Sequence, residues 1–397
     1  MLRFWLMDTQ KNWKDNLPLT YFKPLSNILS GLLPVYRKWE VLTGKETQVL
    51  TEDYLMEKYG GRAPASLFVN SAVLPDAALA DAVMELAPGE ALYDRQGRWL
   101  GYRHTEDVVP GGRDRAMAWV EAAPKKRVYK GEVVCMDRPY RWILVNGGQI
   151  ERDIRLLDPP AMPCPEGARC LGSHSLYGHM PVESEAVIFD LRQGPVYIGE
   201  DVKLLPGSFI QGPAVILDGS MVKAGTRIYN GTTLGPWTKV GGEIKNVLFQ
   251  GYANKGHDGF LGDSVVGHWC NFGAGTSNSN LKNNYSTIRM WHIAGKGYED
   301  TGRMFLGLVM GDHSKTAINT SLNTGTVIGV SSNIFTRRFP PKFITSFNWG
   351  GEDHNHAYSL QKAMATARTV YGRRNKVFDS VEEKIFEHVY RLVTEWE

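Results

Sequence analysis

One histidine, His257, lies where residues 254–260 interrupt a six-residue rhythm in the sequence. An imidazole with an ordinary pKa is well suited to accept a proton near neutral pH. Lys245 stands twelve residues before His257, and Arg227 stands eighteen residues before Lys245. Guanidinium and ammonium groups form strong charge-assisted hydrogen bonds to phosphate. The three residues therefore predict a general base close to a phosphate-binding site.

Asparagines are concentrated just after this segment, at Asn271, Asn278, Asn280, Asn283 and Asn284. An amide side chain both donates and accepts hydrogen bonds, which suits the hydroxyl groups of a sugar. The same residues are equally typical of turns and of an asparagine ladder along a coil. Both interpretations stay open on the sequence alone.

The element that must position these residues is a six-residue repeat. Aliphatic residues recur at every sixth position, and a small or β-branched residue follows each of them four positions later. Such a period is typical of a parallel β-helix, in which each hexapeptide forms one side of a triangular coil. Residues eighteen apart should then stack, which places Arg227 against Lys245. The aliphatic positions are Ile198, Leu204, Ile210, Ile216, Val222, Ile228, Leu234 and Val240.

The repeat also sets the domain boundaries. Residues 1–180 are expected to form an α/β domain with a strand at 66–70, a helix at 76–86, a strand at 141–145 and a linker at 158–181. Residues 181–350 should form the coil, with an insertion at 278–305 that has no six-residue period. Residues 351–397 should form a helical tail, with helices at 358–371 and 381–396.

Composition narrows the class of protein. The chain has 397 residues, a net charge of +3 and 42 glycines, an excess that the coil explains. The charge is too weak to indicate nucleic-acid binding. No apolar run is long enough to span a membrane, and the N-terminus does not read as a signal peptide. We therefore expect a cytoplasmic protein without nucleic-acid or membrane partners.

The four cysteines, Cys135, Cys164, Cys170 and Cys270, suit a reducing compartment. Cys164 and Cys170 cluster with His174 and His179, but the spacing misses the usual short zinc pairs. Unpaired thiols in a linker and a structural metal both remain open, and we predict no catalytic metal here.

The runs 256–263 and 271–276 resemble the bifunctional UDP-N-acetylglucosamine pyrophosphorylase/glucosamine-1-phosphate N-acetyltransferase family. The longer run 251–285 is more similar to divergent sugar nucleotidyltransferases of Bacteroidetes-like bacteria. The resemblance implies a left-handed β-helix and a homotrimer with active sites between subunits. It also implies transfer of an acetyl group from acetyl-CoA to the amine of an amino-sugar 1-phosphate.

The resemblance assigns expected roles to individual residues. His257 matches the base that deprotonates the sugar amine, and Arg227 and Lys245 match residues that hold the sugar phosphate. Phe260 and Leu281 stand where the family has tyrosines, so the identity of the sugar stays open. The remaining matches are Asn271 and Asn280 at the sugar and Ala274 near the acyl donor.

The N-terminal domain departs further from the family. Thr20 and Lys23 lie in a segment that resembles a nucleotide-binding element, but residues 1–16 contain no glycine for a phosphate-binding loop. Asn70 and Ser71 stand where the family has a Gly-Asp pair that binds metal, which removes a carboxylate that Mg²⁺ prefers. Nucleotidyl transfer with Mg²⁺ is therefore implied by the resemblance, while the activity of this domain stays open.

Two other functions fit a coil of this kind. One is a zinc-dependent lyase similar to γ-class carbonic anhydrases, which needs three histidines that meet between subunits. The other is a sugar-phosphate sensor or scaffold on a degenerate enzyme fold. The histidines available for the lyase are His257, His268, His292 and His313.

Overall fold

The computed structural model describes residues 3–336, 338–351 and 357–396. The chain folds into two compact units. The N-terminal unit comprises Met1–Asn16, Thr20–Ile28 and Leu33–Arg138, and the coil unit comprises Leu17–Leu19, Leu29–Leu32 and Pro139–Glu397. Residues 139–180, which we expected to end the N-terminal domain, thus lie in the same compact unit as the coil.

The N-terminal unit is built on a six-stranded mixed sheet with the order β4-β1-β5-β8-β7-β9. Its first half is parallel, because β1 pairs in parallel with both β4 and β5. The strands are β1 (Arg3–Met7), β4 (Glu46–Leu50), β5 (Ala65–Asn70), β7 (Glu90–Tyr93), β8 (Trp99–Val108) and β9 (Lys125–Val128). The predicted strand at 66–70 is confirmed as β5.

Five helices accompany this sheet. Asp76 caps α4 through a hydrogen bond to the amide of Leu79, which confirms the predicted helix at 76–86. The short strands β6 (Val73–Leu74) and β10 (Val134–Cys135) form a separate antiparallel pair. The helices are α1 (Gln10–Asp15), α2 (Val35–Thr43), α3 (Asp53–Tyr59), α4 (Ala77–Met84) and α5 (Arg113–Glu121).

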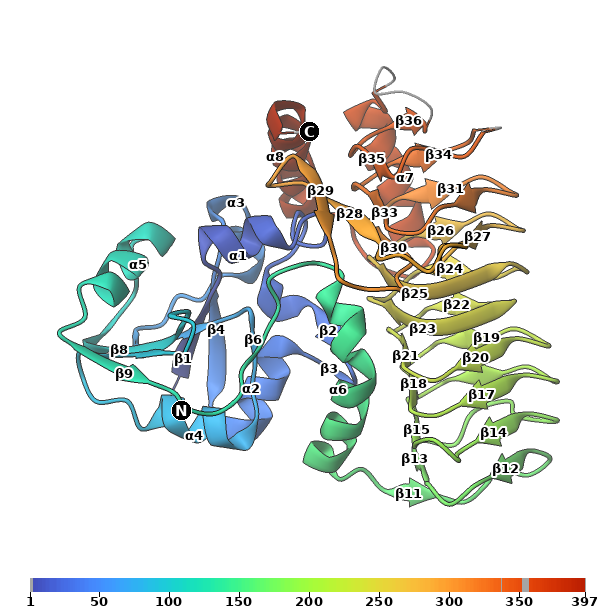
Figure 1. Ribbon diagram of the computed structural model, residues 1–397, viewed down its shortest axis with the longest axis horizontal. Helices are drawn as coiled ribbons and strands as arrows, with labels where there is room; N and C mark the ends of the chain where they lie inside the picture. The colour runs from blue at the N-terminus through green and yellow to red at the C-terminus, as the bar shows by residue number, and fades with distance from the viewer. Residues whose placement is uncertain (1–2, 337, 352–356, 397) are drawn as a thin grey trace. The chain divides into compact units, whose positions relative to one another are not determined.

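The coil unit is a β-helix whose turns stack from β12 (Arg169–Leu171) to β36 (Trp349–Gly350) (Figure 1), and β11 (Ala161–Met162) pairs antiparallel with β13 (Leu176–Gly178) before the first turn. Parallel strands form three faces, as the six-residue repeat predicts for a parallel β-helix. Face A contains β16 (Lys203–Leu204), β19 (Met221–Val222), β22 (Lys239–Val240), β24 (Asn254–Lys255), β26 (Asn271–Phe272), β31 (Lys315–Thr316), β34 (Asn333–Ile334) and β36.

Faces B and C share two long strands that turn the corner between them, β23 (Glu243–Phe249) and β25 (Phe260–Val266). Face B also contains β12 (Arg169–Leu171), β14 (Ile188–Asp190), β17 (Phe209–Gln211) and β20 (Arg227–Tyr229), and the pair β27 (Ser277–Asn278) and β32 (Ser321–Leu322) continues it. Face C contains β13 (Leu176–Gly178), β15 (Val196–Ile198), β18 (Ala214–Ile216), β21 (Thr232–Leu234), β30 (Leu308–Met310), β33 (Thr326–Ile328) and β35 (Phe343–Ile344).

The interior of the coil follows the repeat. All eight aliphatic residues from Ile198 to Val240 are fully buried in one core cluster. The small residues at the ends of corners have a second role, because their hydroxyl groups donate to corner carbonyls. Ser208 donates to the carbonyl of Leu205, and Thr226 donates to that of Lys223. The predicted repeat is therefore confirmed, and serine or threonine is favoured where a corner carbonyl needs a donor.

The insertion is also confirmed. The six-residue repeat is interrupted after β27, and the coil resumes at β30. Between them, β28 (Arg289–His292) and β29 (Gly297–Asp300) form an antiparallel hairpin. The returning segment pairs back through a bridge between Leu281 and Phe305, which fixes the base of the insertion on the coil.

The predicted strand at 141–145 is wrong, because these residues begin the helix α6 (Arg141–Leu157). Its buried residues continue at helical spacing beyond Gly147 and Gly148, which we expected to form a turn. The Nδ2 atom of Asn146 donates to the carbonyl of Gly231 (2.8 Å) and to the hydroxyl of Thr233 (3.0 Å). Packing of this face against the coil outweighs the low helix propensity of the two glycines.

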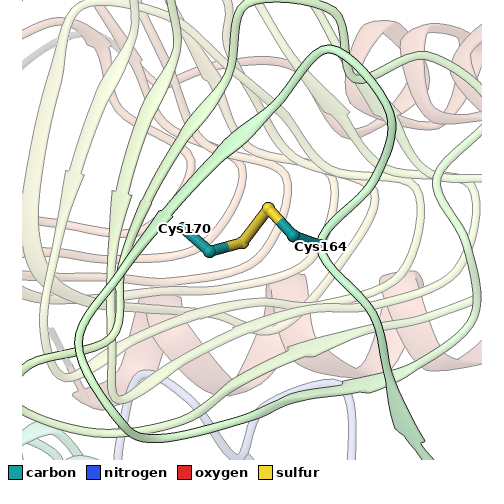
Figure 2. Close-up of a disulfide and its surroundings, with 2 residues drawn as sticks. All are labelled: Cys164 and Cys170. Atoms are coloured by element: carbon teal, nitrogen blue, oxygen red, sulfur yellow. A yellow bond between two sulfur atoms is a disulfide. The ribbon is translucent and has the colours of Figure 1, made fainter.

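The segment between α6 and the coil is not the plain linker that we expected. It contains β11, and its two cysteines, Cys164 and Cys170, form a disulfide (Figure 2). The disulfide differs from the expectation of unpaired thiols. No cluster of three or more histidine, cysteine, aspartate or glutamate side chains suited to a metal occurs among the described residues.

The helical tail is confirmed as α7 (Leu360–Gly372) and α8 (Ser380–Trp396). Tyr371 of α7 stacks on Trp269 with ring centroids 4.3 Å apart, and Phe386 of α8 contacts the ring of His313. The tail therefore packs on turns of the coil. None of the helices in the described part of the chain is long and apolar enough to cross a membrane.

Candidate active site

His257 lies on the edge where face A turns into face B, in the four-residue corner 256–259 between β24 and β25. Its side chain is exposed. The neighbouring corner at 273–276 packs directly on this one, since the amide of Gly275 donates to the carbonyl of Asp258 (3.1 Å). Ala274 belongs to that neighbouring corner, so the structure brings the predicted base and the predicted acyl-donor residue onto adjacent turns.

The predicted stacking of Arg227 on Lys245 is wrong. The register pairs Arg227 with Glu243, and it pairs Lys245 with Tyr229. The corner before β23 contains only Gly241 and Gly242, whereas the equivalent corner one turn earlier contains the four residues 223–226. The turn is therefore two residues short of eighteen.

Both cations nevertheless lie on face B and are exposed. Arg227 forms an ion pair with Glu243 (Nη2–Oε2 3.2 Å). The ammonium of Lys245 lies 5.8 Å from the ring centroid of Phe305, at the end of the insertion. Two positive side chains on adjacent strands of one face can bind the separate oxygens of a phosphate group.

A hollow of about 310 Å³ lies beside Lys245 in the coil unit. Asn246 and Asp263 line it from the coil, and Gly147 and Gly148 line it from α6. An added Cβ on Gly147 would lie 3.7 Å from the Cα atom of Gly231, an ordinary van der Waals contact, so α6 lies close to the coil at this point. The hollow places polar groups around the Lys245 position.

Asp263 connects this hollow to Asn280. The carboxylate accepts a hydrogen bond from Asn246 (2.7 Å) and another from Asn280 (2.5 Å). Its backbone has a φ of +48°, and its carbonyl accepts from the amide of Gly307. The sequence interpretation missed Asp263, although it ends the quoted run 256–263 directly after a glycine. A short acidic residue at such a sharp corner is a signal for a carboxylate turned toward its neighbours.

Asn271 lies on face A, on the other side of the edge from Arg227 and Lys245. Its Oδ1 accepts a hydrogen bond from the Nδ2 of Asn254 (2.8 Å), and the two residues are also paired in the strand register. This pair is a rung of an asparagine ladder on the outer surface of the coil. The ladder fixes the orientation of the Asn271 amide beside the corner that contains Ala274.

Phe260 and Leu281, which replace tyrosines of the family, occupy defined positions. The ring of Phe260 folds over Gly262, where an added Cβ would come within 2.4 Å of the Cζ atom. Leu281 forms the backbone bridge to Phe305. Neither side chain offers a hydroxyl group, so a substrate contact made by tyrosines in the family has to come from other residues here.

In the N-terminal unit, the carboxyl ends of the parallel strands β1, β4 and β5 meet at Asp8, Thr51, Asn70 and Ser71. Ligands of α/β proteins commonly bind at such an edge. Asp8 is fully buried and accepts hydrogen bonds from Ser71, Thr51 (2.6 Å) and the amide of Leu25 (3.3 Å). Burial raises the pKa of Asp8 from 3.8 to about 6.

The residues that we expected to contact a nucleotide are also buried. The hydroxyl of Thr20 donates to the carbonyl of Trp13 (2.7 Å), and Lys23 is 3% exposed. The Oδ1 of Asn70 accepts from Asn12 of α1 (2.9 Å). Helix α1 thus follows β1 where the family has a glycine-rich loop.

The histidines considered for a zinc site each contact different residues. The Nδ1 of His292 contacts Glu299 at 2.9 Å, and the Nδ1 of His268 lies 3.8 Å from Asp312. His313 packs against Tyr371 and Phe386 of the tail. Within the described part of this chain they do not converge with His257.

Parts of this chain are similar in sequence to known proteins. A family model described as sugar nucleotidyl transferase matches residues 4–159. A bifunctional sugar-1-phosphate nucleotidylyltransferase/acetyltransferase of Sulfurisphaera tokodaii is 32% identical over 145 residues, which are 36% of this chain and 36% of that protein. The bifunctional protein GlmU of Acidithiobacillus ferrooxidans is 30% identical over 173 residues, which are 42% of this chain and 33% of GlmU.

The chain thus matches only about a third of the length of these two relatives. It covers more of the putative uncharacterized acetyltransferase YaiX of Escherichia coli, at 32% identity over 162 residues, 39% of this chain and 67% of YaiX. Fold and site together define a nucleotidyltransferase-type domain joined to an acetyltransferase-type β-helix. The chain belongs to the GlmU-like family, of which it is a divergent member. These likenesses do not favour the lyase or the sensor.

Substitution of Asp263 should show how much its two hydrogen bonds stabilise the coil. We expect Asp263→Asn to lower the free energy of unfolding by about 1–3 kcal/mol, because one charge-assisted hydrogen bond is lost while asparagine still tolerates a positive φ. Denaturant unfolding measures the change. Asp201→Asn is the matched control, since Asp201 has a φ of +54° but is exposed. Equal losses in both variants would contradict the role of the carboxylate.

The raised pKa of Asp8 gives a pH dependence with a defined sign. Between the unfolded value of 3.8 and the native value of about 6, the native state binds more protons than the unfolded state. This contribution to stability is therefore complete below pH 4 and is lost as pH rises through 6. We expect wild type to lose about 1 kcal/mol between pH 5 and 7.5 that Asp8→Asn does not lose, as measured by urea unfolding. Parallel pH curves would show that Asp8 does not titrate in this range.

Proposed function

We propose that the coil unit transfers an acetyl group from acetyl-CoA to the amine of an amino-sugar 1-phosphate. The observation that carries the proposal is the exposed imidazole of His257 on a coil edge next to Ala274, with Arg227 and Lys245 on the adjoining face. The names of the relatives from Sulfurisphaera tokodaii and Escherichia coli include the word acetyltransferase and support acetyl transfer. The product would serve synthesis of a nucleotide sugar similar to UDP-N-acetylglucosamine.

The chemistry assigns one role to each group. The imidazole of His257 takes a proton from the sugar amine, because a protonated amine cannot attack a carbonyl. The amine nitrogen bonds to the thioester carbonyl carbon, the carbon–sulfur bond breaks, and the proton returns to the departing sulfur of coenzyme A. Arg227 and Lys245 would hold the phosphate, and Asn271 and Asn280 would orient the sugar, so that the amine stays close to the thioester.

We further propose that the active protein is a homotrimer with this edge between subunits. Exposed apolar side chains continue the edge beyond His257, as Ile318 is 69% and Phe335 is 47% exposed. Ile318 belongs to the corner 317–320, which packs on the corner of Ala274 through the amide of Asn319 (2.7 Å). Burial of such side chains against a second copy would also enclose the reacting groups.

For the N-terminal unit we propose nucleotidyl transfer to a sugar 1-phosphate, supported by the family model over residues 4–159. The residues at the carboxyl edge of β1 and β5 do not fit a Mg²⁺ site. Asp8 is fully buried and already hydrogen-bonded, and Asn70 contributes an amide in place of a carboxylate. We therefore propose no metal-dependent step at these residues.

We also propose a cytoplasmic location, because both reactions use cytoplasmic substrates. In that compartment the disulfide of Cys164 and Cys170 would be exposed to reduction.

Acetyl transfer can be tested with acetyl-CoA and glucosamine 1-phosphate by following release of free coenzyme A. We expect His257→Ala to lower kcat at least about 100-fold, since general-base catalysis contributes that much. His179→Ala is the control, because His179 is also an exposed histidine of the coil unit but lies in its first turns. Activity of His257→Ala within a few-fold of wild type would remove His257 as the base.

Nucleotidyl transfer can be tested in the same preparation with UTP and N-acetylglucosamine 1-phosphate. We expect release of pyrophosphate, and we expect His257→Ala to leave it unchanged because the coil residue takes no part. Acetyl transfer without pyrophosphate release, with UTP and with other nucleoside triphosphates, would show that the N-terminal unit has lost this reaction.

A further inference from the structure

A lysine occupies a position in the coil interior that the repeat reserves for an aliphatic residue. The register aligns Leu204, Val222 and Val240 in the inward row of face A, and Val240 pairs with Lys255. Lys255 is 1% exposed and is among the largest fully buried side chains. A buried ammonium group is costly, so its presence in an aliphatic row needs a physical explanation.

The ammonium of Lys255 bonds to the corner that carries His257. It donates to the carbonyl of His257 (2.6 Å) and to the carbonyl of Asp258 (3.1 Å). The carbonyl of Asp258 also accepts from the amide of Gly275 on the next turn. The backbone on both sides of the His257 side chain is therefore held from inside the coil.

The corner needs this donor because it lacks the usual one. Comparable corners end in Ser208 and Thr226, whose hydroxyl groups donate to corner carbonyls. The corner 256–259 ends in Gly259, which has no side chain and has a φ of +121°. A Cβ at Gly259 would lie 2.1 Å from the carbonyl oxygen of Thr276, so neither serine nor threonine fits there.

We propose that Lys255 is a positioning residue for His257, which orients the catalytic corner from within the coil. This inference rests on the proposed role of His257 as the base. Lys255 does not reach the substrate, since its side chain is buried in the interior, whereas the imidazole of His257 is exposed. It acts by restricting the backbone from which the imidazole projects, and a small displacement of a reacting group is sufficient to lower the rate strongly.

The electrostatics of the site agree with this geometry. Burial lowers the pKa of Lys255 to about 8, and the nearby Asp258 opposes that shift. The group is thus still mostly protonated at neutral pH, when it is the stronger donor to the two carbonyls.

The chain contains a matched control in Lys315. Lys315 is partly buried and lies outside the inward row, but its pKa is also lowered to about 8 by burial, and it also donates to a backbone carbonyl, that of His313 (2.7 Å). Lys315 lies on β31, two strands along face A from β24, in the register row of Asn271 and Asn254, and its ammonium donates to a different corner of the coil. A loss of function common to both lysines would therefore indicate a general effect of removing a buried ammonium.

The test compares Lys255→Met, Lys255→Gln and Lys315→Met in the full-length protein. We expect Lys255→Met to lower kcat for acetyl transfer about 10- to 100-fold while both KM values change less than about twofold. Lys255→Gln keeps an N–H donor and should retain more activity. In a His257→Ala background, Lys255→Met should cause no further loss, because its effect passes through the imidazole.

Hydrogen–deuterium exchange supplies a readout that does not need the enzyme to be active. Peptides that cover residues 256–260 should exchange faster in Lys255→Met than in wild type, whereas their exchange rate should be the same in Lys315→Met as in wild type. The thermal stability of neither variant should fall. Unchanged exchange and unchanged kcat in Lys255→Met would overturn the inference. Faster exchange in Lys255→Met together with full activity of His257→Ala would give a different result. It would show that Lys255 restrains the corner 256–259 but that His257 is not the base.

Discussion

The stacking of inward side chains under parallel strand pairing is the constraint on which the coil depends. Each turn buries its aliphatic residue against those above and below it, as in the row Leu204, Val222 and Val240. Because strand pairing alternates inward and outward positions, one row fixed inside fixes the neighbouring rows outside. The outward chemistry of faces A and B is therefore set by the core and does not depend on contacts among the functional residues themselves.

Irregular turns on this regular core produce the site. Gly241 and Gly242 shorten one corner, and the shorter turn places Lys245 beside Tyr229 instead of Arg227. A Cβ on Gly241 would come within 3.0 Å of the amide nitrogen of His257, so the small corner also makes room for the next one. Glycine at this corner therefore allows two turns to approach each other closely. Because this turn has sixteen residues instead of eighteen, Arg227 and Lys245 lie in separate rows of face B.

The sequence was sufficient for the parts of the fold that depend on local periodicity. The repeat from Ile198 to Val240, the insertion and the tail helices follow directly from spacing. The helix α6 could not be predicted, because Asn146 and its neighbours are helical through hydrogen bonds to Gly231 and Thr233, far along the chain. The same holds for the site, since the spacing located His257 but not the short turn beneath it.

Buried polar residues mark where sequence patterns stop being sufficient. Asp263 and Lys255 both lie inside the run that identifies the family, yet a pattern alone does not show which side chain faces inward. Lys255 occupies a position where an aliphatic residue would have served the coil, whereas Asp263 occupies a sharp corner with a positive φ, and each holds neighbouring groups by two hydrogen bonds. A buried lysine weakens the core that it interrupts, so the value of Lys255 lies in the geometry that it imposes on the neighbouring corner. In this chain that geometry is the orientation of His257 on the edge between faces A and B, and the orientation of Asn280, which follows β27 of face B.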